Sequence, residues 1–330
     1  MSKTIKNEYY KHLNYDAIYS AYLRARVNKR NKKEILLFEL DLETNLMNIL
    51  SSLKNNTYKM GKYHEFKIYE PKERIIHSLP FKDRIVHQWY IYEFIKPYIM
   101  PRLIINTYAC INKRGTHKCV LDTQKMMRKM NINNKNYYVL KIDIKKFFYS
   151  INKDILFNIM SKYITDKYIL NLTKIFIYDG YSKGIVIGNY VSQWFANIYL
   201  NELDKYLKEE LKIKYYTRYC DDGILLLNNK LEAKEVLKKI NIFVNSKLHL
   251  ELNNKTRYFP NKLGINYCGY QIFNDYILLR VRSKKKIRQT IKLYKEGKID
   301  DAKYLAKKNS WLGHATRSDS YNLINKLITQ

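Results

Sequence analysis

Two acidic segments of the chain carry residues that could hold divalent metal ions against a triphosphate. Asp143 lies in the segment Val139–Phe148, and Asp221 and Asp222 follow the apolar start of Tyr216–Leu226. Nucleotidyl transfer uses one ion to activate the attacking 3′-hydroxyl and another, about 3.5–4 Å away, to stabilise the leaving pyrophosphate. Mg²⁺ prefers oxygen ligands and keeps waters and phosphate oxygens, so two or three carboxylates suffice. We therefore expect two Mg²⁺ ions here, with Mn²⁺ as a substitute.

The aspartate pair has a simpler reading. Asp-Gly is a common hairpin turn signal, and Asp222 is followed by Gly223. The strand that leads to Asp143 favours the metal site, because two strand ends can bring three carboxylates together. Carboxylates about 4 Å apart repel by about 1–4 kcal/mol, depending on the effective dielectric, so such a cluster favours a bound cation.

Other side chains suggest contacts to a nucleotide or a nucleic acid. Phe148 could lie beneath the sugar of an incoming nucleotide and exclude a 2′-hydroxyl, although a core phenylalanine is the simpler reading. Lys72 and Arg74 lie at a predicted hairpin tip and could clamp a triphosphate, where arginine offers a bidentate fork. Tyr219 and Tyr267 could stack on bases, although packing explains them equally well among 32 tyrosines.

The charge of the chain predicts a polyanionic partner. Its 330 residues include 61 Lys and Arg against 30 Asp and Glu, a formal net charge of +31. Each phosphate neutralised by such a side chain releases a condensed counterion. An A+T-rich genome also favours lysine and tyrosine codons, but it explains the small number of acidic residues less well. The four cysteines form no C-x-x-C pair.

The periodicity of the sequence predicts an α+β fold rather than a regular βαβ wind. We expect no membrane helix, because no apolar run approaches about 18 residues, and no signal peptide. The expected strand at 137–144 is apolar nearly throughout, and a strong amphipathic helix is expected over 192–211. Further helices are expected over 9–56, 83–99, 151–176, 232–248 and from 283 onward, and further strands within 63–79 and over 213–219, 223–227, 267–273 and 276–281.

These segments resemble, in order, the blocks of a reverse transcriptase. Tyr219–Asp222 resembles the Tyr-x-Asp-Asp box of that family, and Leu140–Phe148 its first catalytic strand. Lys72–Arg74 resembles the fingers hairpin, and Gly188–Leu200 the helix that supports the template and the nascent base pair. The remaining blocks are Phe81–Val86, Tyr108–His117, Leu252–Thr256 and Tyr267–Tyr270.

The resemblance implies a right-hand polymerase fold and an RNA-directed DNA polymerase activity. It implies metal ligation at Asp143, Ile144, Asp221 and Asp222, and pyrophosphate protonation by Lys255. The implied substrate-binding residues are Lys72, Arg74, Phe148, Ile187, Gly188 and Gln193. The implied primer grip is Tyr267, Cys268, Gly269 and Tyr270. The predicted divisions are helices and fingers over 1–136, a palm over 137–280 with a fingers insertion near 150–185, and a thumb over 281–330.

Within the family, the chain resembles the reverse transcriptases of diversity-generating retroelements. The similarity lies in Ile187–Gln193, in Tyr108–Cys110 and in Trp311–His314. It implies mispairing at template adenines, because Ile187 stands where most relatives carry glutamine and removes a hydrogen-bonding partner near the base. Val186 stands where proline is usual, and Cys220 where methionine or alanine is common.

The resemblance also implies partners and a setting. The expected partners are a structured template RNA, a cDNA or primer, dNTPs and a small, basic, helical accessory protein that is oligomeric. The expected setting is the cytoplasm, with the protein encoded by a prokaryote or a phage. The alternatives are an antiviral-defence or retron-like reverse transcriptase, and a non-catalytic, maturase-like RNA-binding protein.

Overall fold

The computed structural model describes residues 4–69 and 73–328, and it divides into two compact units. Each unit is assembled from separate stretches of the chain. The first unit comprises Met1–Ile105, Ile144–Tyr206 and Ile242–Glu251. The second unit comprises Asn106–Asp143, Leu207–Asn241 and Leu252–Gln330. Asp143, Asp221 and Asp222 therefore all belong to the second unit.

The first unit is mainly helical. Several of its helices begin at a side chain that accepts a hydrogen bond from the first turn, as an N-cap does. Asn14, Asn152 and Asp166 play this part. The helices are α1 (Tyr15–Ala25), α2 (Lys33–Glu39), α3 (Leu42–Lys54), α4 (Phe81–Tyr90), α6 (Phe147–Ser150), α7 (Lys153–Ser161), α8 (Lys167–Ile177) and α9 (Tyr190–Lys205).

A π-helix continues α4. It is η1 (Ile91–Ile99), and it contains Pro97, which has no backbone N–H to donate to the helix. A short 3₁₀ turn, η2 (Met100–Arg102), follows it. A wider helical turn is one way for a chain to accommodate a residue that cannot make the regular bond.

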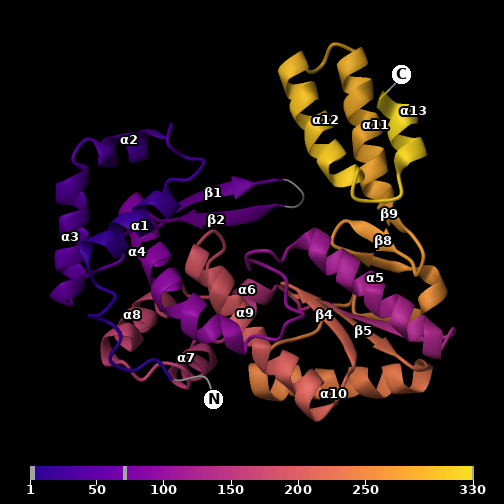
Figure 1. Cartoon of the computed structure of the whole chain (residues 1–330), viewed down its shortest axis with the longest axis horizontal. Helices are drawn as coiled ribbons and strands as arrows, with labels where there is room; N and C mark the ends of the chain where they lie inside the picture. The colour runs from indigo at the N-terminus through magenta and orange to yellow at the C-terminus, as the bar shows by residue number, and fades with distance from the viewer. Residues whose placement is uncertain (1–3, 70–72, 329–330) are drawn as a thin grey trace. The chain divides into compact units, whose positions relative to one another are not determined.

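A two-stranded hairpin completes the first unit. Strand β1 (His64–Ile68) pairs antiparallel with β2 (Arg74–Ser78), and His64 lies opposite Ser78 (Figure 1). The structure thus contains the hairpin predicted within 63–79. Its predicted tip residue Lys72 lies outside the described residues, whereas Arg74 begins β2 and is exposed.

Helix α9 differs from the sequence prediction. An amphipathic helix was expected over 192–211, and α9 together with the π-helix η3 (Tyr206–Glu210) that follows it covers 190–210. The expected amphipathic character was wrong, because α9 is buried around most of its circumference and polar residues are buried with the apolar ones. Asn197, Asn201 and Asp204 are each at most 2% exposed. Asn201, for example, donates to the Arg102 oxygen at 3.3 Å.

The second unit contains a four-stranded antiparallel sheet in the order β4-β5-β3-β6. Its strands are β3 (Tyr138–Ile142), β4 (Tyr215–Tyr219), β5 (Asp222–Leu227) and β6 (Arg257–Pro260). Strand β3 lies inside the sheet, and Val139, Leu140 and Ile142 are at most 1% exposed. This burial confirms the strand expected from its nearly continuous apolar run. Helix α10 (Lys230–Leu248) contributes residues to both units.

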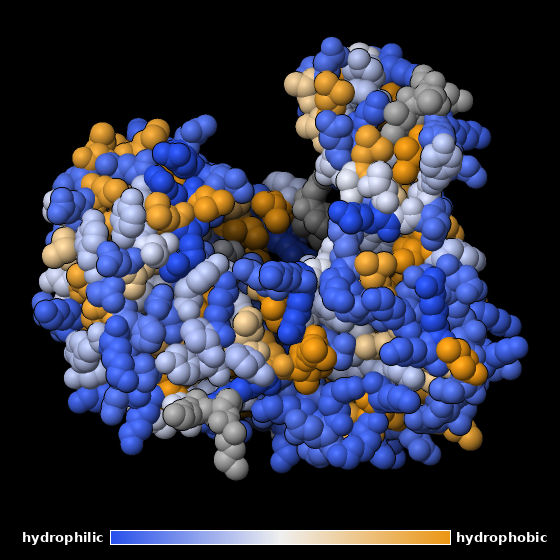
Figure 2. All heavy atoms as spheres, in the orientation of Figure 1, coloured by the Kyte–Doolittle hydropathy of each residue, from blue (hydrophilic) through white to orange (hydrophobic). Residues whose placement is uncertain are grey.

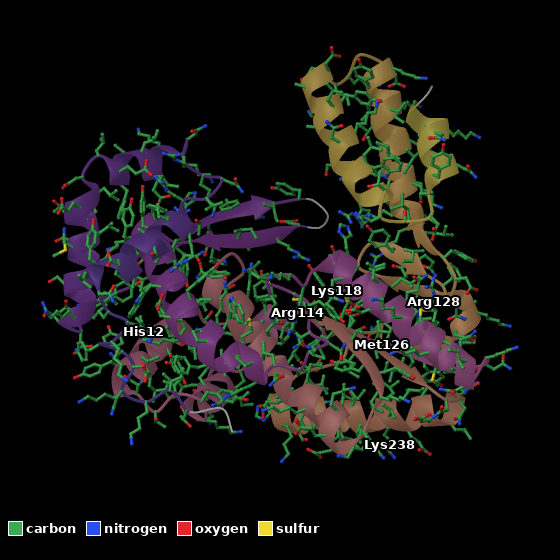
Figure 3. The ribbon with its side chains drawn as sticks, in the orientation of Figure 1. His12, Arg114, Lys118, Met126, Arg128 and Lys238 are labelled. Carbon is green, nitrogen blue, oxygen red and sulfur yellow. The ribbon has the colours of Figure 1, made fainter. Side chains whose placement is uncertain are left out.

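Helix α5 (Thr116–Asn133) packs against β4 within the second unit. Thr123 on the helix lies 3.1 Å from Thr217 on the strand, hydroxyl to hydroxyl. Further along α5, Arg128 donates to the backbone oxygens of Asn274 at 2.8 Å and Asp275 at 3.3 Å (Figure 3). The helix is therefore fixed at both of these points to other elements of the unit.

A smaller sheet and three helices form the rest of the second unit. The sheet order is β7-β8-β9, with β7 (Ile265–Tyr267), β8 (Tyr270–Ile272) and β9 (Ile277–Leu279), and the 3₁₀ turn η4 (Asn261–Leu263) precedes it. The helices are α11 (Val281–Lys295), α12 (Asp301–Ala315) and α13 (Tyr321–Ile328). One apolar core contains residues of both sheets, α5, α11 and α12. Helices and antiparallel sheets together confirm the α+β class.

The visible surface is largely hydrophilic. Hydrophilic residues cover much of the visible face in Figure 2. Across residues 4–69 and 73–328, the structure contains no helix long and apolar enough to span a membrane.

Candidate active site

The pairing register brings the three aspartates to one end of the four-stranded sheet. Tyr219 pairs with Asp222, so Cys220 and Asp221 form a two-residue hairpin turn between β4 and β5. Cys220 adopts a φ of 57°, the left-handed conformation that such turns require. Ile142 pairs with Gly223 on the neighbouring strand, so the next residue, Asp143, reaches the same end of the sheet as Asp222.

The three carboxylates act on one another electrostatically. The pKa of Asp143 is raised, first by burial and then by the negative charges of Asp222 and Asp221. Lys141 and Lys255 lower it in part. The strand register accounts for both effects, because Asp143 lies at the same end of the sheet as Asp222 and the turn that contains Asp221. The arrangement stores repulsion that a divalent cation would relieve.

The Asp222 carboxylate forms an ion pair with a lysine of the same sheet. Its Oδ1 is buried, accepts no hydrogen bond and lies 3.4 Å from Lys141 Nζ, within ion-pair distance. Lys141 Nζ also donates to the Asn266 oxygen at 3.0 Å. Carboxylate oxygens are the ligands that hard cations prefer. The donor chemistry therefore fits a magnesium-type ion.

The side chains are not gathered as a finished ligand set. Within the described residues, no group of three His, Cys, Asp or Glu side chains is placed closely enough to hold a metal ion. The fit of the site thus rests on donor type, on charge and on the shared sheet end of the three aspartates.

The backbone of Asp143 is fixed by the loop that carries Lys255. The N–H of Asp143 donates to Thr256 Oγ1 at 3.1 Å, and its carbonyl accepts from the Asn253 N–H at 2.8 Å. Thr256 Oγ1 also lies 3.2 Å from the Asp143 carbonyl oxygen. Lys255 itself is exposed, and its positive charge lowers the pKa of Asp143. The predicted pyrophosphate lysine is therefore electrostatically coupled to the predicted metal ligand.

The predicted primer grip forms the turn between β7 and β8. Tyr267 pairs with Tyr270 across Cys268 and Gly269, whose φ values are 47° and 93°. Tyr267 is fully buried, and its hydroxyl donates to the backbone oxygen of Asp222 at 3.1 Å. The turn is thus connected to the strand that carries the aspartate pair.

The first unit holds most of the predicted substrate-binding residues. Ile187 is partly buried, and its carbonyl accepts from the N–H of His77 on β2 at 2.8 Å. Gly188 has a φ of 125°, and a Cβ there would lie 2.6 Å from the His77 oxygen, so the hairpin strand requires glycine at this position. Gln193 is exposed on α9.

Phe148 and Ile144 have different surroundings within that unit. Phe148 is partly buried, and its ring meets that of Phe147 edge-on at 5.7 Å between centroids. Its carbonyl accepts from the Ile185 N–H at 2.9 Å. The Ile144 side chain is 2% exposed, so a backbone oxygen is the ligand that Ile144 could offer a metal ion.

Sequence analysis missed several supporting residues. Lys141 interrupts an otherwise apolar strand, and that interruption was a usable signal for a functional charge. Asn253 and Thr256 carried no comparable signal, since their contacts with Asp143 span more than a hundred residues of chain.

The family of the chain follows from its match to a family model. Residues 62–272 match the model described as reverse transcriptase (RNA-dependent DNA polymerase), and the chain therefore belongs to this family. The matched segment contains all three aspartates. With the antiparallel sheets this match confirms the right-hand polymerase fold class, and it names the family from which the RNA-directed DNA polymerase activity is predicted.

Individual relatives are more distant. A putative COX1/OXI3 intron 2 protein of Saccharomyces cerevisiae is 24% identical over 42% of this chain, which spans about a quarter (24%) of that relative's length. Apo telomerase of Candida tropicalis, truncated from its C-terminal domain, is similar at 15% identity and a TM-score of 0.49, over 72% of this chain and 60% of that one. Telomerase of Candida albicans in complex with a fragment of telomeric RNA gives 9% identity and a TM-score of 0.46, over 77% and 56%.

Proposed function

We propose that the protein synthesises DNA on a structured RNA template with two Mg²⁺ ions, and that Mn²⁺ can replace them. The observation that carries this proposal is the strand register, which brings Asp143, Asp221 and Asp222 to one end of the sheet, where the charges of the other two raise the pKa of Asp143. A non-catalytic RNA-binding protein has no need for three mutually repelling carboxylates at one sheet end.

Each candidate residue then has a defined part in the reaction. Asp143, Asp221 and Asp222 would hold the ions, with the Ile144 backbone oxygen as a further ligand. Bound ions supply activation of the 3′-hydroxyl and stabilisation of the leaving pyrophosphate. Lys255 supplies the proton that the departing pyrophosphate takes up, from an exposed position on the loop that holds the backbone of Asp143. Arg74 and Lys72 contact the triphosphate, and Gly188 and Gln193 lie along the nascent base pair.

Replacing both aspartates of the box tests the metal assignment. Asp221→Asn with Asp222→Asn should abolish dNTP incorporation on a primed RNA while leaving RNA affinity nearly unchanged, because only carboxylate ligands are lost. Asp16→Asn with Asp41→Asn is the matched control, since both residues are exposed and the charge change is the same. Primer extension by the Asp221/Asp222 variant would show that the metal ligands lie elsewhere.

Phe148 is proposed to select the sugar. Phe148→Ala should raise ribonucleotide incorporation relative to dNTP incorporation, because space for a 2′-hydroxyl opens. Phe157→Ala is the control, because Phe157 is also a partly buried phenylalanine of the first unit. Equal dNTP/rNTP selectivity in wild type and Phe148→Ala would remove Phe148 from this role.

The retroelement subtype is the finer part of the proposal. In this reading the protein makes adenine-mutagenised cDNA that diversifies a target gene, and a small basic accessory protein assists it in a prokaryotic or phage-infected cytoplasm. The support is the sequence Ile187–Gln193, with Ile187 half-buried beside β2. Ile187→Gln should lower misincorporation at template adenines, and Ile105→Gln, at a 75% exposed position, is the control.

Sequencing the cDNA made from co-purified RNA separates the alternatives. Adenine-specific errors support diversification, whereas faithful or non-templated products favour a defence or retron-like enzyme. RNA binding without any DNA product favours a maturase-like role, for which the similarity to an intron-encoded yeast protein is the specific observation.

A further inference from the structure

His314 occupies the space that a side chain would need at the turn between β7 and β8. A Cβ built on Gly269 would lie 2.8 Å from His314 Cε1 and 2.9 Å from Nε2. Gly269 also has a φ of 93°, so glycine is favoured here for two independent reasons. The imidazole thus lies directly on the backbone of the turn.

The same histidine contacts the next residue from both its ring and its backbone. The imidazole lies 4.2 Å from the Tyr270 ring, centroid to centroid, with 34° between their planes. The Tyr270 hydroxyl donates to the His314 backbone oxygen at 2.9 Å. His314 Nε2 lies 3.5 Å from the Gly269 oxygen. Two adjacent residues of the turn are therefore in contact with a single residue of α12.

The position of His314 is fixed by its own helix. Trp311 and Ala315 flank it on α12, are 9% and 0% exposed, and belong to the same apolar core as Tyr270. The pKa of His314 is lowered, mainly by burial, with His117 and Arg280 contributing and a backbone contact to Gly269 opposing. Burial therefore disfavours the charged form of the imidazole, as its packing on Gly269 and Tyr270 requires.

Displacement of the turn would be transmitted to the aspartate pair. Gly269 lies two residues from Tyr267, and the Tyr267 hydroxyl donates to the backbone oxygen of Asp222. The structure thus contains a continuous chain of contacts from α12 through the turn to β5. Each link joins buried or partly buried groups of the second unit.

We infer that His314 is a positioning residue for the polymerase reaction. Its side chain packs against Gly269 and Tyr270 and thereby fixes the turn between β7 and β8. That turn in turn aligns the primer terminus with the aspartates. This inference rests on the proposed function, because it assumes that the turn contacts the primer. The imidazole acts by shape and not by proton transfer, since it touches no reacting atom.

Four variants of the full chain test the inference. His314→Ala should raise the KM for primer–template by about tenfold, as a misplaced active-site support commonly does. The affinity for unprimed RNA should stay unchanged. His314→Phe should restore the KM to within about twofold, because a planar ring still packs on Tyr270. Gly269→Ala should also raise the KM. If the two residues act together, the double variant Gly269→Ala with His314→Ala should raise the KM by at least about threefold less than the two single increases multiplied together. His249→Ala, at an exposed histidine, is the control.

The outcomes distinguish failure of the positioning role of His314 from failure of the proposed polymerase function. If wild type extends primers and His314→Ala lowers only the melting temperature, with KM and kcat unchanged, the positioning role is wrong. Multiplicative effects of Gly269→Ala and His314→Ala would also overturn it. If wild-type protein fails to extend any primed RNA, the proposed function itself fails, and the inference falls with it.

Discussion

The hydroxyl of Tyr267 donates a hydrogen bond to the backbone oxygen of Asp222, 3.1 Å away, from a fully buried position. This bond joins the small sheet to the strand that begins with the aspartate pair. The bond is partly buried and holds β5 against β7 in the second unit.

Removing this hydroxyl should loosen the aspartate strand. Tyr267→Phe should reduce the free energy of unfolding by about 1 kcal/mol and lower kcat for dNTP incorporation severalfold. Tyr276→Phe is the matched control, since Tyr276 is 44% exposed. Unfolding by urea and single-nucleotide extension are the measurements. An unchanged kcat would mean that the bond is structural only.

Neutralising Asp143 should stabilise the metal-free protein while abolishing activity. Burial and two neighbouring carboxylates disfavour its charge, so Asp143→Asn should melt at a higher temperature than wild type in EDTA. Added Mg²⁺ should raise the melting temperature of wild type and leave that of the variant nearly unchanged. Asp16→Asn serves as the control. A variant that responds to Mg²⁺ as wild type does would argue against Asp143 as a ligand.

Buried His87 should make the protein sensitive to acid. Burial lowers its pKa to about 3, and its Nε2 is buried without a hydrogen bond. Below pH 6.5 the unfolded chain therefore binds a proton at His87 that the folded chain does not bind. The contribution of neutral His87 to the free energy of unfolding is fully present above pH 6.5 and is lost as pH falls toward 3. The free energy of unfolding should fall by up to about 1.4 kcal/mol per pH unit in this range.

His87→Leu should flatten this dependence, measured by urea unfolding between pH 7 and pH 4 as a difference from wild type. His249→Leu, at an exposed histidine, should leave the slope as it is in wild type. Equal slopes for wild type and His87→Leu would contradict the assignment.

Gly223 should tolerate no side chain. A Cβ there would lie 2.7 and 2.8 Å from the side chain of Ile142, the residue opposite it in the register. Gly223→Ala should cost about 1–3 kcal/mol of stability, as overpacking does, and should lower dNTP incorporation. Adding Ile142→Ala should recover part of that loss in melting temperature and in extension assays. A double variant that loses more stability than the two single variants lose together would refute the steric explanation.

RNA affinity should depend steeply on salt if the net charge of +31 is functional. The log–log slope should be about 0.7–0.9 per phosphate contacted. Filter binding or fluorescence anisotropy from low to high salt measures it. A flat response would assign the lysine excess to genome composition.

Local sequence patterns were enough to predict much of the sheet that carries the site. The apolar run before Asp143 predicted the buried strand β3, and the strands expected over 213–219 and 223–227 correspond to β4 and β5. The Asp222–Gly223 turn signal was wrong in position, because the turn lies at Cys220 and Asp221. These features depend on residues close together in the chain, where periodicity and turn chemistry are informative.

Features that depend on distant packing could not be predicted. The burial of Asn201 on α9 rests on the Arg102 carbonyl, 99 residues earlier in the chain. The contact of His314 with Gly269 depends on how α12 packs on the small sheet, and no local pattern encodes it. The predicted roles of Lys255 and Phe148 stay predictions, since side-chain placement alone does not reveal what they bind.

The order of strand pairing has a consequence for synthesis of the protein. Strand β3 needs β5 and β6 as neighbours, and Tyr138 pairs with Pro260, which a ribosome reaches only after the whole intervening segment. The carboxylate cluster cannot be assembled while that segment is still being made. The end of the sheet that carries Asp143, Asp221 and Asp222 is therefore completed only in molecules elongated beyond β6.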